Sequence, residues 1–339
     1  MKKFLILIVI LSASFANAQP PGYYDSAIGL VGEPLKQALH EIIDDHVEYS
    51  YDDLRDFILM DTDEDPDNPN NIILLYTGRS QNKNTFGGGA NDWNREHVWA
   101  KSHGDFGTTP PAGTDAHHMR PTDASVNSSR GNLDFDNGGV QHPEATGCYY
   151  DNDSWEPRDE VKGDVARMIF YMSVRYEGGG GEPDLEVVDE VNTSPAPEHG
   201  KFSTLYQWHQ QDPPDAFEIN RNEVIYSYQG NRNPFIDHPE FLILIYDPTN
   251  AVGEFSQGID FTMYPNPANE FTTINFTNSL TQSGKLHVRN MLGQLIMTED
   301  LDPGISQFKL NISTLTDGLY IISMEVGGKM STVKLSVRH

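Results

Sequence analysis

An acid and a histidine stand side by side in the stretch NREHVWAKSH, residues 94–103. Glutamate oxygens bind hard metal ions, and a histidine side chain exchanges protons near neutral pH. Glu96 and His97 could therefore supply a metal ligand and a general base to one active site. Neighbouring side chains on a regular strand face opposite ways, so such a site would have to use both faces of the chain.

A second polar stretch, TDAHHMRPTDASVNSSRGN, follows at residues 114–132. Asn127 offers an amide oxygen, and Arg120 and Arg130 offer paired N–H donors that suit phosphate oxygens. Mg²⁺ prefers oxygen ligands, keeps several waters and takes few protein ligands, so Glu96 and Asn127 would suffice. Together the two stretches predict metal-assisted hydrolysis of a phosphodiester, in which the adjacent histidine takes a proton from water.

Two other interpretations of these residues remain open. His97, His103, His117 and His118 could bind zinc, but the chain has no H-E-x-x-H motif and no pair of cysteines. Alternatively, the histidines and arginines have a structural role and tie loops down by hydrogen bonds. This second interpretation is strong for any single residue and weaker for the combination, because buried ionisable groups are costly and cluster at functional sites.

The stretches NREHVWAKSHG and DAHHMRPTDASVNSSRGN resemble those of the endonuclease I family, secreted and periplasmic nucleases of the His-Me finger (ββα-metal) superfamily. The likeness extends to VARMIFYMSVRY and to GNRNPFIDHPEF, and covers roughly residues 22–245. It implies a metal-dependent endonuclease that cleaves DNA, RNA or both with little sequence preference. It also implies that Glu96 and Asn127 bind the metal, Mg²⁺ with Mn²⁺ or Ca²⁺ as alternatives, and that His97 is the general base.

The resemblance leaves open which arginine stabilises the scissile phosphate. Some relatives place this arginine between the two motifs, where residues 101–114 of this chain contain none. Arg120, Arg130 and, more distantly, Arg95 are the candidates, and we assign the first two to catalysis. His117 is expected to orient the site or to support the fold.

The N-terminus and the composition point to an exported protein. The first eighteen residues hold two lysines, a short apolar run and Ala-Asn-Ala before Gln19, which is typical of a cleaved secretory signal. No later stretch approaches about 20 consecutive apolar residues, so we expect no membrane span after cleavage. Cys148 is the only cysteine, which excludes an intramolecular disulfide.

The acidic excess is confined to the central region. The net charge is −27, yet residues 263–339 hold six basic and six acidic residues, which leaves fifteen basic and forty-four acidic residues for 19–262. Binding of a polyanion would therefore rest on a local group of cations within about 8 Å, the screening length at physiological salt. Such binding should weaken steeply as salt is raised.

Apolar periodicity predicts several helices in the central region. The clearest are EPLKQALHEIIDDH and VKGDVARMIFYMSVRYE, followed by YDDLRDFILM, KFSTLYQWHQQ and FEINRNEVIYSY. NIILLYTG is a strand candidate. The acidic stretch at 61–71 is interpreted as a solvated loop, because a calcium loop would need Gly at its sixth place and Glu at its twelfth. Asn231 and Asn233 are expected to bond to nearby backbone and to have a structural role.

From residue 263 the pattern changes to short alternating runs separated by Gly, Asn, Asp and Pro, which predicts a small antiparallel sandwich. The run from YPNPA through NMLGQ and GLYIISM resembles the C-terminal sorting domain of the type IX secretion system. That resemblance implies contact with the secretion machinery, and an adhesive or sugar-binding sandwich is the alternative.

We therefore expect an α+β protein that is secreted or held at the outer-membrane surface after export through the periplasm. The alternative function is a non-catalytic adhesion or binding protein on a nuclease-like scaffold. The expected parts are a signal peptide at 1–18, a mainly helical nuclease domain with a ββα-metal motif at 19–250, a linker at 251–262 and an all-β sandwich at 263–339.

Overall fold

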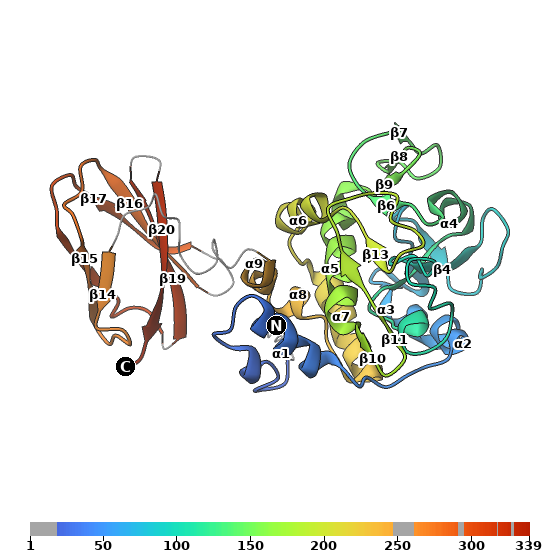
Figure 1. Cartoon of the computed structure of the whole chain (residues 1–339), viewed down its shortest axis with the longest axis horizontal. Helices are drawn as coiled ribbons and strands as arrows, with labels where there is room; N and C mark the ends of the chain where they lie inside the picture. The colour runs from blue at the N-terminus through green and yellow to red at the C-terminus, as the bar shows by residue number, and fades with distance from the viewer. Residues whose placement is uncertain (1–18, 247–260, 291–294, 317, 327–328) are drawn as a thin grey trace, which may run out of the picture. The chain divides into compact units, whose positions relative to one another are not determined.

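The computed structural model describes residues 19–246, 261–290, 295–316, 318–326 and 329–339 (Figure 1). The expected signal peptide and most of the expected linker lie outside the described residues. The chain divides into two compact units, Met1–Leu242 and Ile243–His339. The first unit mixes helices with short strands, and the second is built of β-strands.

The helices of the first unit follow the apolar periodicity of the sequence. Helix α1 (Glu33–Ile43) starts with a proline in its first turn and buries Leu35, Leu39 and Ile43. Helix α5 (Lys162–Arg175) is buried on almost every side and lies in the middle of the unit (Figure 1). The others are α2 (Tyr51–Asp53), the π-helical turn η2 (Leu54–Ile58), α3 (Leu59–Thr62), α4 (Ala124–Arg130), α6 (Phe202–Gln211), α7 (Ala216–Gln229), α8 (Pro234–Asp237) and α9 (Glu240–Tyr246), with 3₁₀ turns η1 (Asp25–Ala27), η3 (Ala112–Thr114) and η4 (Asp159–Val161).

The segment around α8 has the structural role that its asparagines predict. The amide nitrogen of Asn231 donates to the carbonyl of Ile43 at 3.0 Å. The side chain of Asn233 accepts from the backbone N–H of Phe235 at 3.0 Å and so caps α8, whose first residue is Pro234. These bonds tie the chain after α7 back onto the first unit.

The acidic stretch at 61–71 is not the solvated loop that we expected. It contains β1 (Glu64–Asp65) and most of β2 (Asn68–Ile73), which join β3 (Ser80–Asn82) in an antiparallel sheet. Asp63 is fully buried. Its carboxylate accepts hydrogen bonds from Arg120 at 2.6 Å and from Arg221 at 3.3 Å. Two buried guanidinium groups thus compensate an acid that the sequence pattern alone places in water.

The site is carried by the antiparallel pair β4 (Trp93–His97) and β5 (Met119–Asp123), with α4 directly after β5. In this pair Glu96 lies opposite Arg120, and His97 opposite Met119. The remaining strands of the unit are β6 (Asp134–Phe135), β7 (Val140–Gln141), β8 (Tyr149–Tyr150), β9 (Ser154–Glu156), β10 (Glu177–Gly179), β11 (Glu182–Asp184), β12 (Glu186–Val187) and β13 (Glu198–His199).

The second unit is a sandwich of two antiparallel sheets, in the orders β14-β15-β18 and β17-β16-β19-β20. Its core contains Ile274 and Leu310 from the first sheet and Leu286, Ile322 and Leu335 from the second, so the sheets face each other. The strands are β14 (Phe261–Tyr264), β15 (Phe271–Phe276), β16 (Gly284–Asn290), β17 (Leu295–Leu301), β18 (Gln307–Asn311), β19 (Gly318–Val326) and β20 (Lys329–Val337). Among the described residues of the chain, no helix is long and apolar enough to cross a membrane.

Candidate nuclease site

Strand β4 distributes the side chains of the first motif between two environments. The amide nitrogen of Asn127, on α4, donates to the side-chain oxygen of Asn94 at 2.7 Å and to the carbonyl of Arg95 at 3.1 Å. Because side chains two residues apart on a strand share a face, Asn94 and Glu96 face the same way. Helix α4 therefore brings Asn127 to the side of β4 that carries Glu96.

The opposite face of β4 carries Arg95 and His97, which both lie against the ring of Tyr51. The guanidinium carbon of Arg95 is 3.4 Å from the centroid of this ring, and the imidazole of His97 is stacked on it with centroids 5.6 Å apart. Arg95 also donates to the carbonyl of Tyr51. The adjacent acid and histidine of the motif thus have different neighbours.

Glu96 is almost completely buried, with 2% of its surface exposed. One carboxylate oxygen, Oε1, accepts from the hydroxyl of Tyr76 at 2.7 Å and lies 3.5 Å from a guanidinium nitrogen of Arg130. Burial raises the pKa of Glu96, and the positive charge of Arg130 and the Tyr76 hydroxyl oppose that rise. These two partners favour the ionised form of the carboxylate, which burial disfavours.

Two oxygens on this side of β4 are left for a cation. In the part of the chain that the structure describes, no protein hydrogen bond is made to Oε2 of Glu96 or to Oδ1 of Asn127. The amide group of Asn127 is oriented by the two bonds that its nitrogen donates, so its oxygen is the free atom. A carboxylate and an amide oxygen form a donor set suited to a hard divalent ion such as Mg²⁺.

His97 is buried and held by one ring nitrogen. Nε2 lies 3.1 Å from the carbonyl oxygen of Gly113, an atom that can only accept, so Nε2 carries the hydrogen. The lone pair is then on Nδ1. Burial lowers the pKa of His97 well below its usual value, and the neighbouring His118 adds to the lowering. The imidazole is therefore neutral at pH 7 and able to accept a proton.

The guanidinium of Arg120 bonds to other carboxylates than that of Glu96, although the two residues lie opposite each other on β4 and β5. This guanidinium, 1% exposed, donates to Asp63 at 2.6 Å and to Asp164 at 3.3 Å. Both carboxylates are largely buried as well. Arg120 thus links β5 to the start of β1 and to α5, and its donors face protein carboxylates rather than solvent.

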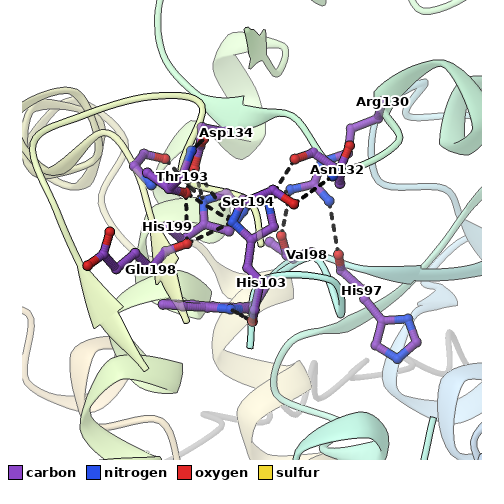
Figure 2. Close-up of polar contacts among 12 residues, drawn as sticks. His97, Val98, His103, Arg130, Asn132, Asp134, Thr193, Ser194, Glu198 and His199 are labelled. Atoms are coloured by element: carbon purple, nitrogen blue, oxygen red, sulfur yellow. Dashed lines mark hydrogen bonds and ion pairs between the residues drawn. The ribbon is translucent and has the colours of Figure 1, made fainter. Parts of the chain in front are cut away.

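Arg130 lies beside Glu96 but is also enclosed by protein, with 1% of its surface exposed. Its guanidinium donates to the carbonyl of His97 at 3.2 Å and to that of Val98 at 2.8 Å. Figure 2 shows the carbonyl of His97 directed at Arg130 while the imidazole points away. The side chain of Arg130 therefore holds the backbone at the end of β4.

A separate group of buried residues, His103, Asp134 and His199, has its potential ligand atoms within 4.8 Å of one another (Figure 2). The two imidazoles are stacked, with centroids 4.6 Å apart and planes 23° apart, so their in-plane lone pairs cannot converge on one ion. Both nitrogens of His103 also face carbonyl oxygens, those of Glu198 at 2.7 Å and Asn132 at 2.8 Å. This geometry is that of a hydrogen-bonded cluster rather than of a metal centre.

His117 and His118 take part in the core around the site. Nε2 of His117 lies 3.3 Å from the carbonyl of Asn231, and Nε2 of His118 lies 2.8 Å from that of Ala112. Burial lowers the pKa of each imidazole to about 4. Their Nε2 atoms face backbone carbonyls of separate segments, a supporting arrangement rather than a shared zinc site.

Sequence reasoning missed three residues that touch the site. Tyr76 bonds to Glu96 from a segment that the pattern identified only as a strand, and His199 bonds to Arg130 from β13. Neither has a local signal. Asn94 could have been found, because it stands two residues before Glu96 and shares its face on any strand.

The sequence comparisons place this chain among the nucleases. The family model described as Endonuclease I matches residues 31–240, and the model of the secretion system C-terminal sorting domain matches residues 262–338. The chain belongs to the endonuclease I family and carries a C-terminal sorting domain. It is therefore a secreted or cell-surface hydrolase of the nuclease class, in a family of metal-dependent enzymes.

Curated relatives agree with this family. The chain is 58% identical over 236 residues to an extracellular ribonuclease of Bacillus subtilis, which covers 69% of this chain and 82% of the relative. It is 61% identical over 226 residues to an extracellular ribonuclease of Bacillus amyloliquefaciens, covering 66% of this chain and 78% of the relative. An extracellular deoxyribonuclease of Aeromonas hydrophila is 29% identical over 129 residues, which is 36% of this chain and 48% of the relative.

Proposed function

We propose that the chain is an endonuclease that hydrolyses phosphodiester bonds of RNA and DNA with little sequence preference. His97 is the general base, and Glu96 and Asn127 hold one divalent ion, Mg²⁺ or else Mn²⁺ or Ca²⁺. The pair β4 and β5 with helix α4 is the ββα-metal motif of this site. The observation that carries the proposal is the division of β4, which sets Glu96 and Asn127 on one face and the His97 imidazole on the other.

Adjacent residues on a strand face opposite ways, and this arrangement allows Glu96 and His97 to contact one phosphodiester from two sides. A phosphodiester can lie between the two, with its non-bridging oxygens toward the oxygen ligands and its far side toward the imidazole. When bound, the ion would offset the negative charge of the scissile phosphate and of the leaving oxygen. Glu96 and Asn127 would hold this ion. Their oxygens without a protein hydrogen bond, Oε2 of Glu96 and Oδ1 of Asn127, fit that role.

His97 activates the attacking water through Nδ1. The carbonyl of Gly113 keeps the hydrogen on Nε2, so Nδ1 has the lone pair that takes a proton from water. The water oxygen forms a new bond to phosphorus, the bond from phosphorus to the leaving oxygen breaks, and the leaving oxygen takes up a proton from solvent water. Tyr51 supports the ring from one side and fixes its direction.

The phosphate contact is assigned to Arg95 rather than to the two buried arginines. Arg120 donates to buried carboxylates, and the two terminal nitrogens of Arg130 are engaged with backbone carbonyls. Arg95 lies on the His97 face with 11% of its side chain exposed, and Lys101 nearby is exposed. These two cations are close enough to His97 to influence its protonation. A small local group of this kind can bind phosphate within an acidic protein, because distant acids are screened.

Both RNA and DNA are proposed as substrates, and contacts to phosphates carry no sequence information. The ribonuclease relatives match most of the first unit, which favours RNA, and the deoxyribonuclease relative supports DNA. The sorting domain is proposed to engage the type IX secretion machinery, which would deliver the enzyme to the cell surface or the medium.

The proposal is tested with purified chain from Gln19 to His339, supplied with plasmid DNA or RNA and with Mg²⁺, Mn²⁺ or Ca²⁺. We expect cleavage that EDTA abolishes. His97→Ala should lower kcat by about 10²–10⁴-fold, the usual contribution of a general base, and added imidazole should restore part of it.

The matched control is His209→Ala, which also removes a buried histidine of the first unit but one that bonds to Pro239 instead. This variant should keep the wild-type kcat. If no divalent ion supports cleavage of either polymer by the wild type, the chain is a binding protein on a nuclease scaffold. If cleavage survives EDTA, the roles given to Glu96 and Asn127 are wrong.

A further inference from the structure

We propose that His199 is a positioning residue for the metal-binding carboxylate of the nuclease site. It acts through Arg130, whose guanidinium it holds against Glu96 and against the end of β4. This inference rests on the proposed function, since it concerns the ion that Glu96 is proposed to hold. On this proposal the buried cluster of His103, Asp134 and His199 is not a metal centre itself. It supports the metal site at Glu96.

The first step is the direction of the His199 imidazole, which is fixed from both sides. The ring lies between His103, at 4.6 Å between centroids and 23° between planes, and Phe135, at 5.3 Å and 21°. Trp99 closes its edge at 5.3 Å. His199 has no exposed surface. A ring stacked on two sides can turn only within its own plane, and its nitrogens determine where it stops.

The second step is the tautomer of His199. Nδ1 lies 3.1 Å from the carbonyl of Gly200 and 3.3 Å from a carboxylate oxygen of Asp134, both of which accept. Nδ1 therefore carries the hydrogen, and Nε2 has the lone pair. Asp134 is itself held by the backbone N–H of Gly200 at 2.8 Å and by Thr193 at 2.8 Å. The residues on both sides of β13 thus set the acceptor side of His199 toward α4.

The third step is the contact with Arg130. Nε2 of His199 lies 3.3 Å from one terminal nitrogen of the Arg130 guanidinium, which also donates to Val98. The other terminal nitrogen faces the carbonyl of His97 and Oε1 of Glu96. Because a guanidinium is planar and rigid, fixing one terminal nitrogen fixes the direction of the other. The ring of Phe135, 4.7 Å from the guanidinium carbon, supports the same orientation.

The consequence concerns the affinity for the ion. Outer partners that orient a ligand typically change metal affinity by about 10–100-fold when they are removed. Arg130 is such a partner of Glu96, and His199 is one contact further away. Loss of the His199 imidazole should therefore weaken metal binding by a smaller factor, on the order of threefold to tenfold, without removing the base at His97.

The test compares His199→Ala with His103→Ala in the chain from Gln19 to His339. Both variants remove one ring of the same stack, but their contacts differ, because of these two imidazoles only that of His199 bonds to Arg130. Mn²⁺ and Mg²⁺ binding to the metal-free protein is measured by calorimetry, and the metal concentration for half-maximal cleavage is measured in parallel. We expect a weaker binding constant for His199→Ala, a smaller loss for His103→Ala, because Phe135 still supports the His199 ring, and a similar kcat at saturating metal for both.

His199→Gln is the conservative variant, because its amide can donate toward Asp134 and accept from Arg130. It should restore metal binding. His199→Leu, which fills the space of the ring without an acceptor for Arg130, should bind metal more weakly and keeps the test decisive if the alanine variant does not fold. A folded His199→Ala with wild-type metal binding would overturn the inference, as would an equal loss in His103→Ala. Calorimetry also separates the two proposals: a wild type that binds metal but cleaves neither RNA nor DNA contradicts the proposed function alone.

Discussion

At the scale of single residues, the site depends on giving two neighbours opposite electrostatic surroundings. Glu96 must be ionised to bind a cation, and Arg130 with Tyr76 opposes the rise in its pKa that burial causes. His97 must be neutral to accept a proton, and burial with His118 keeps its pKa low. Titratable neighbours whose environments push their charges apart are a recurring arrangement in acid–base catalysis.

The roles of the arginines can be separated by salt dependence. Arg95→Ala removes the proposed phosphate contact, so the plot of log KM against log salt concentration should become shallower by about one unit. Arg120→Met instead removes a buried partner of Asp63 and Asp164, which should lower the free energy of unfolding by about 3–5 kcal/mol and leave the salt slope unchanged. Steady-state kinetics at several salt concentrations, with urea denaturation alongside, would measure both. A changed slope only in the Arg120 variant would return the phosphate contact to that residue.

At the scale of elements, the sequence predicts long periodic helices well and the short strands poorly. Helices α1, α5, α6 and α7 are confirmed. Only α1 buries a plain apolar stripe; α5 is buried on almost every side, and α7 buries mainly polar side chains around Ile225. The small sheet of β1, β2 and β3 was missed, since its strands are largely polar and the buried Asp63 just before β1 depends on arginines far along the chain.

The same limit applies to the candidate site. Glu96, His97 and Asn127 are found from the motif, and their roles remain predictions. Their supports are invisible in the sequence: Tyr76 lies 20 residues from Glu96, and His199 lies 69 residues from Arg130. Only the fold brings such pairs together, and neither partner belongs to a local pattern that would indicate it.

Helix α4 offers a test of how far one element controls the site. Asp123 caps α4 by accepting from the backbone N–H of Ser125 at 3.1 Å, one turn before Asn127. Asp123→Ala should lower the free energy of unfolding by about 1–2 kcal/mol and raise the metal concentration needed for cleavage, because the amide oxygen of Asn127 becomes less well placed. Chemical denaturation and metal titration measure the two effects.

The matched control for this prediction is Asp215→Ala, which removes an equivalent cap from α7, where Asp215 accepts from Glu218 at 2.8 Å. Helix α7 carries none of the proposed ligands or the base. Its variant should lose similar stability and keep the wild-type metal requirement. Equal shifts in metal requirement for both variants would mean that general stability, not the placement of α4, controls the ion.

At the scale of the whole molecule, the two units have separate tasks and separate cores. The core of the sandwich draws its buried residues from Ala268 to Val337 alone. Deletion of residues 261–339, from the start of β14, should therefore leave kcat/KM of the purified enzyme within about twofold of wild type. In cells the same deletion should stop surface delivery, which fractionation and immunodetection would measure. Loss of activity in the purified truncated protein would contradict a role confined to sorting.

The first unit should lose stability in mild acid. Burial lowers the pKa of His117, His118 and His209 to about 4, whereas an unfolded histidine titrates near pH 6.5. Between these values the unfolded chain binds protons that the folded chain refuses, so stability falls as the pH falls. Burial raises the pKa of Glu218 to about 7, and this group acts in the opposite direction because its folded form is already protonated there.

Three histidines against one glutamate leave a net difference of two protons, a loss of about 2.7 kcal/mol per pH unit once the pH is well below about 6.5. All four tryptophans of the chain are buried in the first unit, so their fluorescence during urea denaturation reports on that unit alone. Measurements at about pH 7, 6 and 5 should show falling midpoints. His209→Leu removes one of the three groups, so its stability should depend less steeply on pH, by about one proton. Midpoints that stay constant or rise in acid would show that these histidines are protonated in the folded protein.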